Sequence, residues 1–274
     1  MIGEADARDG DSGAAAKERF AALIAPVVGT ETVLAAQAME LAAGDSAGRA
    51  SARVNSRELS RQANIERVIR FASDDFGSGE SGSPVDPSWL DRFFEHAQDI
   101  REESEQRIWG RILAREFASP GSVSKRTLGF LSAMDSWELA GLAEYCAFAF
   151  AFESGWRFMF DEDVARREMW TYGREIDLTQ HFIAIGLLSG ETGVIKPRSA
   201  KGLRLCYQGK AFELRGEITP EDGLPSVGVA YRKFSAVGQQ LSEALRTKSF
   251  FGYARNLIAM LNVERGLDFV LLEE

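Results

Sequence analysis

The chain has 274 residues, of which 45% are hydrophobic, 27% charged and 10% aromatic, as in an ordinary globular protein with a full core. Its net charge of −9 argues against non-specific binding of nucleic acid or of an anionic membrane by the protein as a whole. The two cysteines, Cys146 and Cys206, cannot form a disulfide framework or a CxxC metal site, so we expect a reducing, cytoplasmic environment.

The N-terminal third is predicted to be helical after a disordered tail. Residues 1–16 are acidic and rich in small residues, without the order of a signal peptide. Residues 21–44 are apolar but interrupted by Pro26, Gly29 and two glutamates, which excludes a transmembrane segment. We therefore expect a buried or self-associating helix there, rather than one that contacts a membrane surface. A second helix is predicted over residues 53–76, with a core stripe formed by Leu59, Ala63, Ile65, Ile69 and Ala72.

A run of Gly and Ser at residues 77–84 predicts a linker, and Asp86-Pro87 then begins a central helical domain. The first helix buries Trp89, Leu90, Phe93, Phe94 and Ala97, and the second Ile108, Trp109, Ile112, Leu113 and Phe117. The break at Ser119-Pro120-Gly121 ends the second helix, and Ser122 or Ser124 begins the third. Asp135 is expected to cap a fourth helix, with Glu138 reaching back in a capping box.

The segment from residue 148 to 170 is ambiguous. The alternation of Phe148, Phe150 and Phe152 is typical of a strand, whereas the alanines between them continue the preceding helix. We favour a helix that ends near Gly155, followed by another helix between Phe158 and Trp170.

From about residue 177 the pattern changes to that of a mixed module. A helix is predicted up to Gly190, followed by a hairpin of residues 203–207 and 211–215 around Gln208-Gly209-Lys210. A third strand within residues 227–234 precedes a helix capped by Ser235, and a last helix ends at Gly266 before a short strand. This order resembles a winged helix.

The predicted fold class is therefore α+β and mainly α. An N-terminal and central helical bundle precedes a winged-helix-like C-terminal module with a small antiparallel sheet. The predicted divisions are a tail at 1–16, an N-terminal helical region at 17–76, a linker at 77–85, a central helical domain at 86–175 and the C-terminal module at 176–274.

Three segments carry a resemblance to a known family: RQANIERVI at 61–69, VDPSWLDRFF at 85–94 and WGRILAREFASPGSVSKRTL at 109–128. Together they resemble an uncharacterised bacterial family, domain of unknown function 2806, over roughly residues 20–260. The chain is more distantly similar to helical bacterial proteins linked to abortive phage infection. The resemblance implies a mainly helical bacterial protein, carried on mobile or defence loci, and it assigns no catalytic residues.

The residue types that usually catalyse reactions or bind metals and phosphates do not have the spacing that such sites require. His96 and His181 have no second ligand three or four positions away, so we expect structural roles for both. Residues 161–163, Asp-Glu-Asp, are interpreted as an acidic helix start that the following arginines neutralise. The Gly190–Lys196 segment lacks the Gly-Lys-Ser/Thr of a phosphate loop. We predict no catalytic residue, no metal site and no cofactor.

Basic residues gather in the C-terminal part instead. Residues 192–256 contain 11 Lys and Arg against 5 Asp and Glu, a local charge of +6. The candidate contacts to nucleic acid or to a partner are Lys196, Arg198, Lys201, Arg204, Arg232 and Lys233.

The sequence thus predicts a cytoplasmic, non-enzymatic interaction or regulatory component, with a link to phage defence or a stress response. We expect it to bind a protein partner or to self-associate. We do not expect peripheral membrane contact, because the apolar segment at residues 21–44 is better explained by a buried or self-associating helix. The alternative is a nucleic-acid-binding protein that uses the basic winged-helix-like module.

Overall fold

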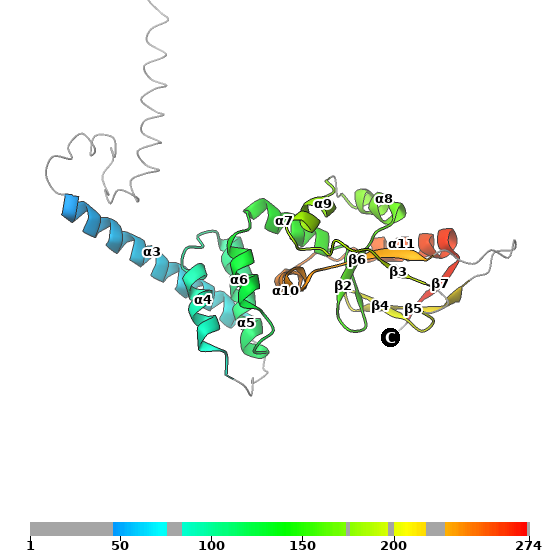
Figure 1. The fold of residues 1–274 in the computed structure, drawn as a ribbon, viewed down its shortest axis with the longest axis horizontal. Helices are drawn as coiled ribbons and strands as arrows, with labels where there is room; N and C mark the ends of the chain where they lie inside the picture. The colour runs from blue at the N-terminus through cyan, green and yellow to red at the C-terminus, as the bar shows by residue number, and fades with distance from the viewer. Residues whose placement is uncertain (1–45, 76–83, 174–175, 197–199, 218–227, 273–274) are drawn as a thin grey trace, which may run out of the picture.

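The computed structural model describes residues 46–75, 84–173, 176–196, 200–217 and 228–272. The predicted tail, the alanine-rich segment at 21–44 and most of the linker lie outside these residues. Helices make up 56% of the described part and a single antiparallel sheet provides the strands, which confirms an α+β fold that is mainly α. Figure 1 shows the first four of the described helices on one side of the molecule and the sheet on the other.

The helical side begins with α3 (Ser46–Asp74), which packs against α4 (Pro87–Ala97) and α5 (Glu103–Ala118). Next come α6 (Lys125–Ser132) and α7 (Ser136–Cys146). The caps predicted from the sequence are present. The Asp86 carboxylate accepts from the Ser88 amide at 2.9 Å, the Ser124 hydroxyl accepts from the Thr127 amide, and Asp135 and Glu138 form the capping box.

The sheet has seven strands in the order β3-β6-β2-β1-β4-β5-β7, and it curls into a half-barrel. The strands are β1 (Phe150–Phe152), β2 (Arg157–Phe160), β3 (Gly193–Ile195), β4 (Arg204–Tyr207), β5 (Lys210–Glu217), β6 (Val229–Lys233) and β7 (Leu267–Leu271). The predicted β4–β5 hairpin is confirmed. Gln208 and Gly209 both have positive φ, 45° and 87°, as a two-residue type I′ turn requires.

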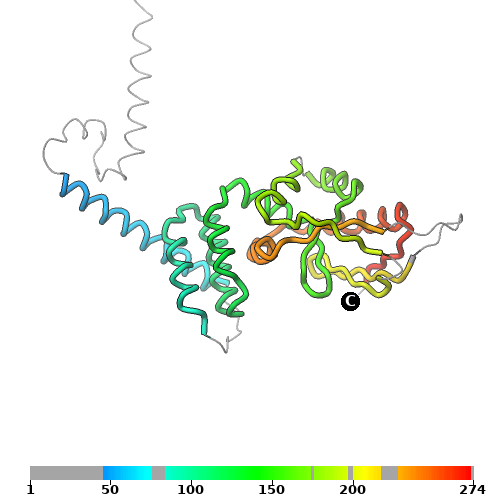
Figure 2. The backbone as a smooth tube through the Cα atoms, in the orientation of Figure 1, coloured from blue at the N-terminus to red at the C-terminus, as the bar shows by residue number. Residues whose placement is uncertain are grey.

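Four further helices accompany the sheet. They are α8 (Asp163–Thr171), α9 (Thr179–Ala184), α10 (Ala236–Ala244) and α11 (Phe251–Arg265). α11 packs on α8 and β7, whereas α10 contacts α5, α6 and α7 and so joins the sheet to the helical side. The backbone trace in Figure 2 shows α10 between the two parts.

The helix that we favoured up to Gly155 is wrong. Residues 150–160 form the β1–β2 hairpin, and Gly155 lies in its turn with φ of 82°. Besides this local pairing, Ala151 pairs with Cys206, more than 50 residues later in the chain, so the strand has a second partner that no local window contains. The helix predicted from residue 158 begins only at Asp163 for the same reason, because residues 157–160 pair with β6.

Other details of the prediction also change. The helix expected to stop at Gly190 ends at Ala184, because the chain turns at Gly186, where φ is 84°. Leu59, Ile69 and Phe117, expected in the core, are 72%, 42% and 42% exposed. The winged-helix-like module is not confirmed, since its strands share one sheet with β1 and β2 from before residue 176. The domain divisions themselves stay predictions.

Candidate functional site

The five predicted basic contact residues that the structure describes come from separate parts of the sheet. Lys196 follows β3, next to Ile195, which pairs with Val229 at the start of β6, whereas Lys233 ends β6. Lys201 and Arg204 lie before and at the start of β4, which β2 and β1 separate from β6. Arg198 lies outside the described residues.

Arg232 is held within the protein. Its guanidinium donates to the carbonyls of Ser189 and Gly190 at 2.8 and 2.9 Å and to the Asp161 carboxylate at 2.8 Å. Its side chain is 11% exposed. Lys233, the next residue on the strand, is exposed, and its ammonium lies 5.7 Å from the centre of the Phe152 ring.

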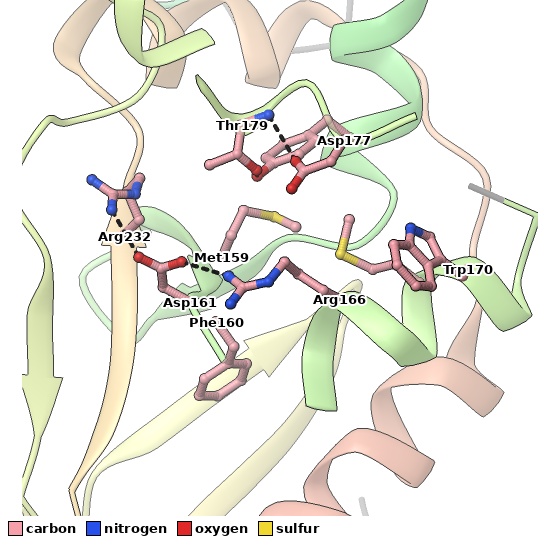
Figure 3. A pocket seen from close by; sticks show the side chains of 10 residues that line it. Met159, Phe160, Asp161, Arg166, Trp170, Asp177, Thr179 and Arg232 are labelled. Atoms are coloured by element: carbon pink, nitrogen blue, oxygen red, sulfur yellow. Dashed lines mark hydrogen bonds and ion pairs between the residues drawn. The ribbon is translucent and has the colours of Figure 1, made fainter. Parts of the chain in front are cut away.

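Asp161 lies between two arginines, as Figure 3 shows, with Arg166 on one carboxylate oxygen at 3.0 Å and Arg232 on the other. Arg166 also binds Asp163, and this ion pair lowers the pKa of the Asp163 carboxyl below its ordinary value. The predicted acidic helix start, neutralised by a following arginine, is confirmed at α8. The charges link β2, β6, α8 and the segment before β3.

The cavity beside this network measures about 20 Å³, which is room for one water molecule. Its lining adds Tyr145, Met159, Trp170, Asp177 and Thr179. The Tyr145 and Thr179 hydroxyls are 2.6 Å apart, and the Asp177 carboxylate accepts from the Thr179 amide at 2.9 Å. Charges that are already paired around so small a space hold segments together and leave no room for a substrate.

A larger cavity of about 270 Å³ lies between the end of α7, the end of α8 and the segment that leads into α11. Its apolar side is formed by Phe148, Tyr172 and Phe250, whose rings contact one another. Arg246, which binds Asp75 at 2.6 Å, and Lys248 lie at its edge. An apolar floor with cationic side chains beside it suits a small amphipathic anion.

The largest of these cavities, about 560 Å³, lies between α3 and the beginning of α5, and our sequence analysis missed it. Its lining residues are Arg67, Arg70, Phe71, Arg101, Glu103, Gln106 and Arg107. The arginines come from segments about 35 residues apart, so composition counted along the chain does not reveal them. Arginine also recurs at residues 49, 53 and 57, earlier on α3, but these residues do not line the cavity.

Both histidines contact neighbouring side chains. His181 Nε2 lies 2.7 Å from a Glu138 carboxylate oxygen, and the ring centres of His181 and Trp137 are 4.9 Å apart. His96 lies near Trp109, with ring centres 6.1 Å apart. Within the described ranges, no group of three His, Cys, Asp or Glu is placed to hold a metal ion. The described helices also include none that is long and apolar enough to cross a membrane.

Comparison with known proteins gives one match. Neither the curated proteins nor the solved structures contain a match to this chain. The family described as "Protein of unknown function (DUF2806)" matches residues 48–258, a continuous stretch that crosses from the helical side through the sheet to α11. Because this stretch covers well over half of the sequence, the chain belongs to that family.

Proposed function

We propose that the protein is a non-enzymatic interaction component that binds a macromolecular partner, or a second copy of itself, through the first half of α3. The observation that carries this proposal is the exposure of every residue from 50 to 60, including Val54 at 51% and Leu59 at 72%. Figure 2 shows this half of the helix extending away from the rest of the described chain.

The second half of α3 anchors the exposed half. Val68 and Ala72 are fully buried, and the Asn64 amide donates to the Gln98 carbonyl at 2.9 Å. Arg61 adds an ion pair with Asp99 at 2.9 Å. A free helix of about 15 residues is marginal in water, so the exposed turns depend on this anchored continuation. An anchored helix whose sides are exposed in the described part of the chain offers a surface to a partner.

The test is to replace Val54 and Leu59 together by Glu and to purify the full chain from its native host. Both side chains are exposed, so the variant should keep its melting temperature and lose the partner or the self-associated form. The control is Val263→Glu on α11, which is 85% exposed and far along the chain. A wild-type protein that is monomeric and without a partner, or a partner that the α3 variant retains, contradicts the proposal.

A role in phage defence or in another stress response of the bacterial cytoplasm is proposed from the family resemblance and the distant similarity to abortive-infection proteins. The genes beside it offer a direct test. Defence genes or a dedicated operon partner support the role, and unchanged plaque counts in a strain lacking the gene contradict it.

The second candidate function is nucleic-acid binding through the basic residues of a winged-helix-like C-terminal module. The exposure of Lys196, Lys201 and Lys233 supports it, whereas the pairing of Arg232 with Asp161 removes one of the expected contacts. Changing these three lysines to Glu should abolish binding to a labelled duplex at low salt. Unchanged binding rules this surface out.

A further inference from the structure

We infer that the arginines of α3 and of the start of α5 bind the phosphate backbone of a nucleic acid. This inference rests on the proposed function, because it names the class of partner that α3 binds.

The exposed half of α3 carries a row of arginines. Arg49, Arg53 and Arg57 recur every fourth residue, so they lie along one side of the helix and span about 12 Å. Glu58 is the one acidic residue between positions 46 and 61, and it binds Arg61 at 3.1 Å. The row therefore keeps its positive charge on this helix.

The arginine-lined cavity continues this basic surface. Arg67 and Arg70 come from α3, and Arg101 and Arg107 lie just before and within the first turns of α5. Among the described residues, Glu103 forms an ion pair only with Arg107, at 2.7 Å. The Arg107 guanidinium also lies 4.3 Å from the centre of the Phe71 ring. In the described part of the chain, Arg67, Arg70 and Arg101 form no ion pair within 4 Å, although the charges of Arg57 and Arg101, after that of Arg61, help to lower the pKa of Asp99. Guanidinium groups are the side chains best suited to phosphate.

Gln106 borders the same cavity but does not contact a ligand. It is completely buried, and its amide nitrogen donates to the Ile100 carbonyl at 2.8 Å. A side chain that solvent cannot reach is closed to a ligand as well, so Gln106 holds the start of α5 in place and the arginines provide the binding groups.

The length of the surface indicates a polymer. From Arg49 to Arg70 the helix rises about 31 Å, which corresponds to about nine base pairs of duplex DNA. The net charge of −9 does not prevent such local binding, because charges farther apart than about 8 Å are screened at physiological ionic strength.

The experiment measures binding of the full chain to a labelled DNA duplex of about 30 base pairs and to an RNA of the same length, from about 50 to 200 mM salt. The variant R49E/R53E/R57E should weaken binding at least tenfold and reduce the slope of log K against log salt by about three. The control R126E/R167E/R255E, at exposed arginines of α6, α8 and α11, changes the net charge equally and should stay within about threefold of wild type. Circular dichroism and melting temperature check that both variants fold.

Three results overturn the inference: no binding of either nucleic acid at low salt, equal loss in both variants, or competition by poly-glutamate as effective as that by unlabelled nucleic acid. The last result would identify an acidic protein as the partner. The variant with Val54 and Leu59 both changed to Glu distinguishes failure of this inference from failure of the proposed function. If nucleic acid does not bind but that variant loses a protein partner, the inference alone fails; if it loses nothing, both fail.

Discussion

A single buried carboxylate shapes the turn between α5 and α6. Glu116 is 1% exposed, and its two oxygens accept from the amides of Gly121 at 2.6 Å and Val123 at 2.9 Å. Gly121 has φ of 85°, where a side chain is strained. The turn is thus held by hydrogen bonds from the end of the preceding helix, and its polar residues have structural roles.

We expect Glu116→Ala to lower the free energy of unfolding by about 2–3 kcal/mol, because two amides lose their acceptor in a buried place. Pro120→Ala is the control, since that ring is partly exposed and its loss removes no hydrogen bond. Urea denaturation of both variants measures the difference. Equal stability of the two variants would show that the carboxylate is not needed.

Two buried tyrosines are expected to differ in how replacement by Phe changes the free energy of unfolding. The Tyr207 hydroxyl donates to the Ala147 carbonyl at 2.6 Å and accepts from the Phe250 amide at 3.1 Å, whereas the Tyr253 hydroxyl is buried and has no hydrogen-bond partner among the described residues. Tyr207→Phe should therefore cost about 1–3 kcal/mol at pH 7, and Tyr253→Phe should cost less than about 1 kcal/mol or stabilise the protein.

The pH dependence checks the Tyr253 assignment independently. Burial raises the pKa of the Tyr253 hydroxyl well above its ordinary value, so the folded protein keeps this proton while the unfolded chain loses it near pH 10. Stability is then unaffected below about pH 10 and falls as the pH rises above it. Tyr253→Phe should make this fall less steep in urea titrations at pH 9 and 10.5 (about the range where tyrosine titrates). An unchanged fall contradicts the assignment.

At the scale of elements, α3 and α5 approach closely because of one glycine. A Cβ on Gly110 would lie 2.7 Å from the Cβ of Phe71 and 2.9 Å from the backbone nitrogen of Ala72. Neither atom belongs to the flexible end of a side chain, so the two helices would have to separate. Gly129, on α6, has no neighbour within 4 Å of such a Cβ.

Gly110→Ala should therefore destabilise the protein by about 1–3 kcal/mol through overpacking. Gly129→Ala should stabilise it by about 0.5–1 kcal/mol, because alanine is the better helix former. The same substitution in two helices thus gives opposite signs in thermal or urea unfolding. A stabilising Gly110→Ala would mean that α3 does not pack on α5 at this point.

At the scale of the whole molecule, contacts cross every predicted division in the described chain. Arg115 on α5 binds Glu243 on α10, and the Ser124 amide donates to the Gln240 side chain at 3.0 Å. The Asp161–Arg232 pair joins segments on either side of residue 176, and the buried apolar residues form one cluster from α3 to β7. These links couple the helical side to the sheet.

We therefore expect one cooperative unfolding transition, with far-ultraviolet circular dichroism and tryptophan fluorescence changing together. Leu113→Ala, at a position 4% exposed on the helical side, should lower stability by about 2–5 kcal/mol and shift both signals equally. Two separate transitions, or a shift in one signal alone, would favour independent domains on either side of residue 176.

Much of the helical side could be predicted, because its signals are local. Asp86, Ser124 and Asp135 mark helix starts through hydrogen bonds to residues two or three positions on, and Gly266 ends α11 in the left-handed conformation. The β4–β5 hairpin was equally visible, since its turn needs residues that tolerate positive φ. The three family segments fall in the same well-patterned region.

The remaining features depend on partners distant in the sequence. The alternating phenylalanines at 148–152 fit a helix or a strand, and pairing with β2 and with the distant β4 stabilises the strand. The burial of Arg232 and the arginine cavity between α3 and α5 arise where separate segments meet. By itself, the sequence determined where helices begin, which residues turn and which family the chain resembles, because those properties involve neighbours within a few residues. Tertiary structure decided that there is a single sheet, which arginines are paired and which are exposed, and where the candidate interface lies. These features depend on contacts between residues tens of positions apart.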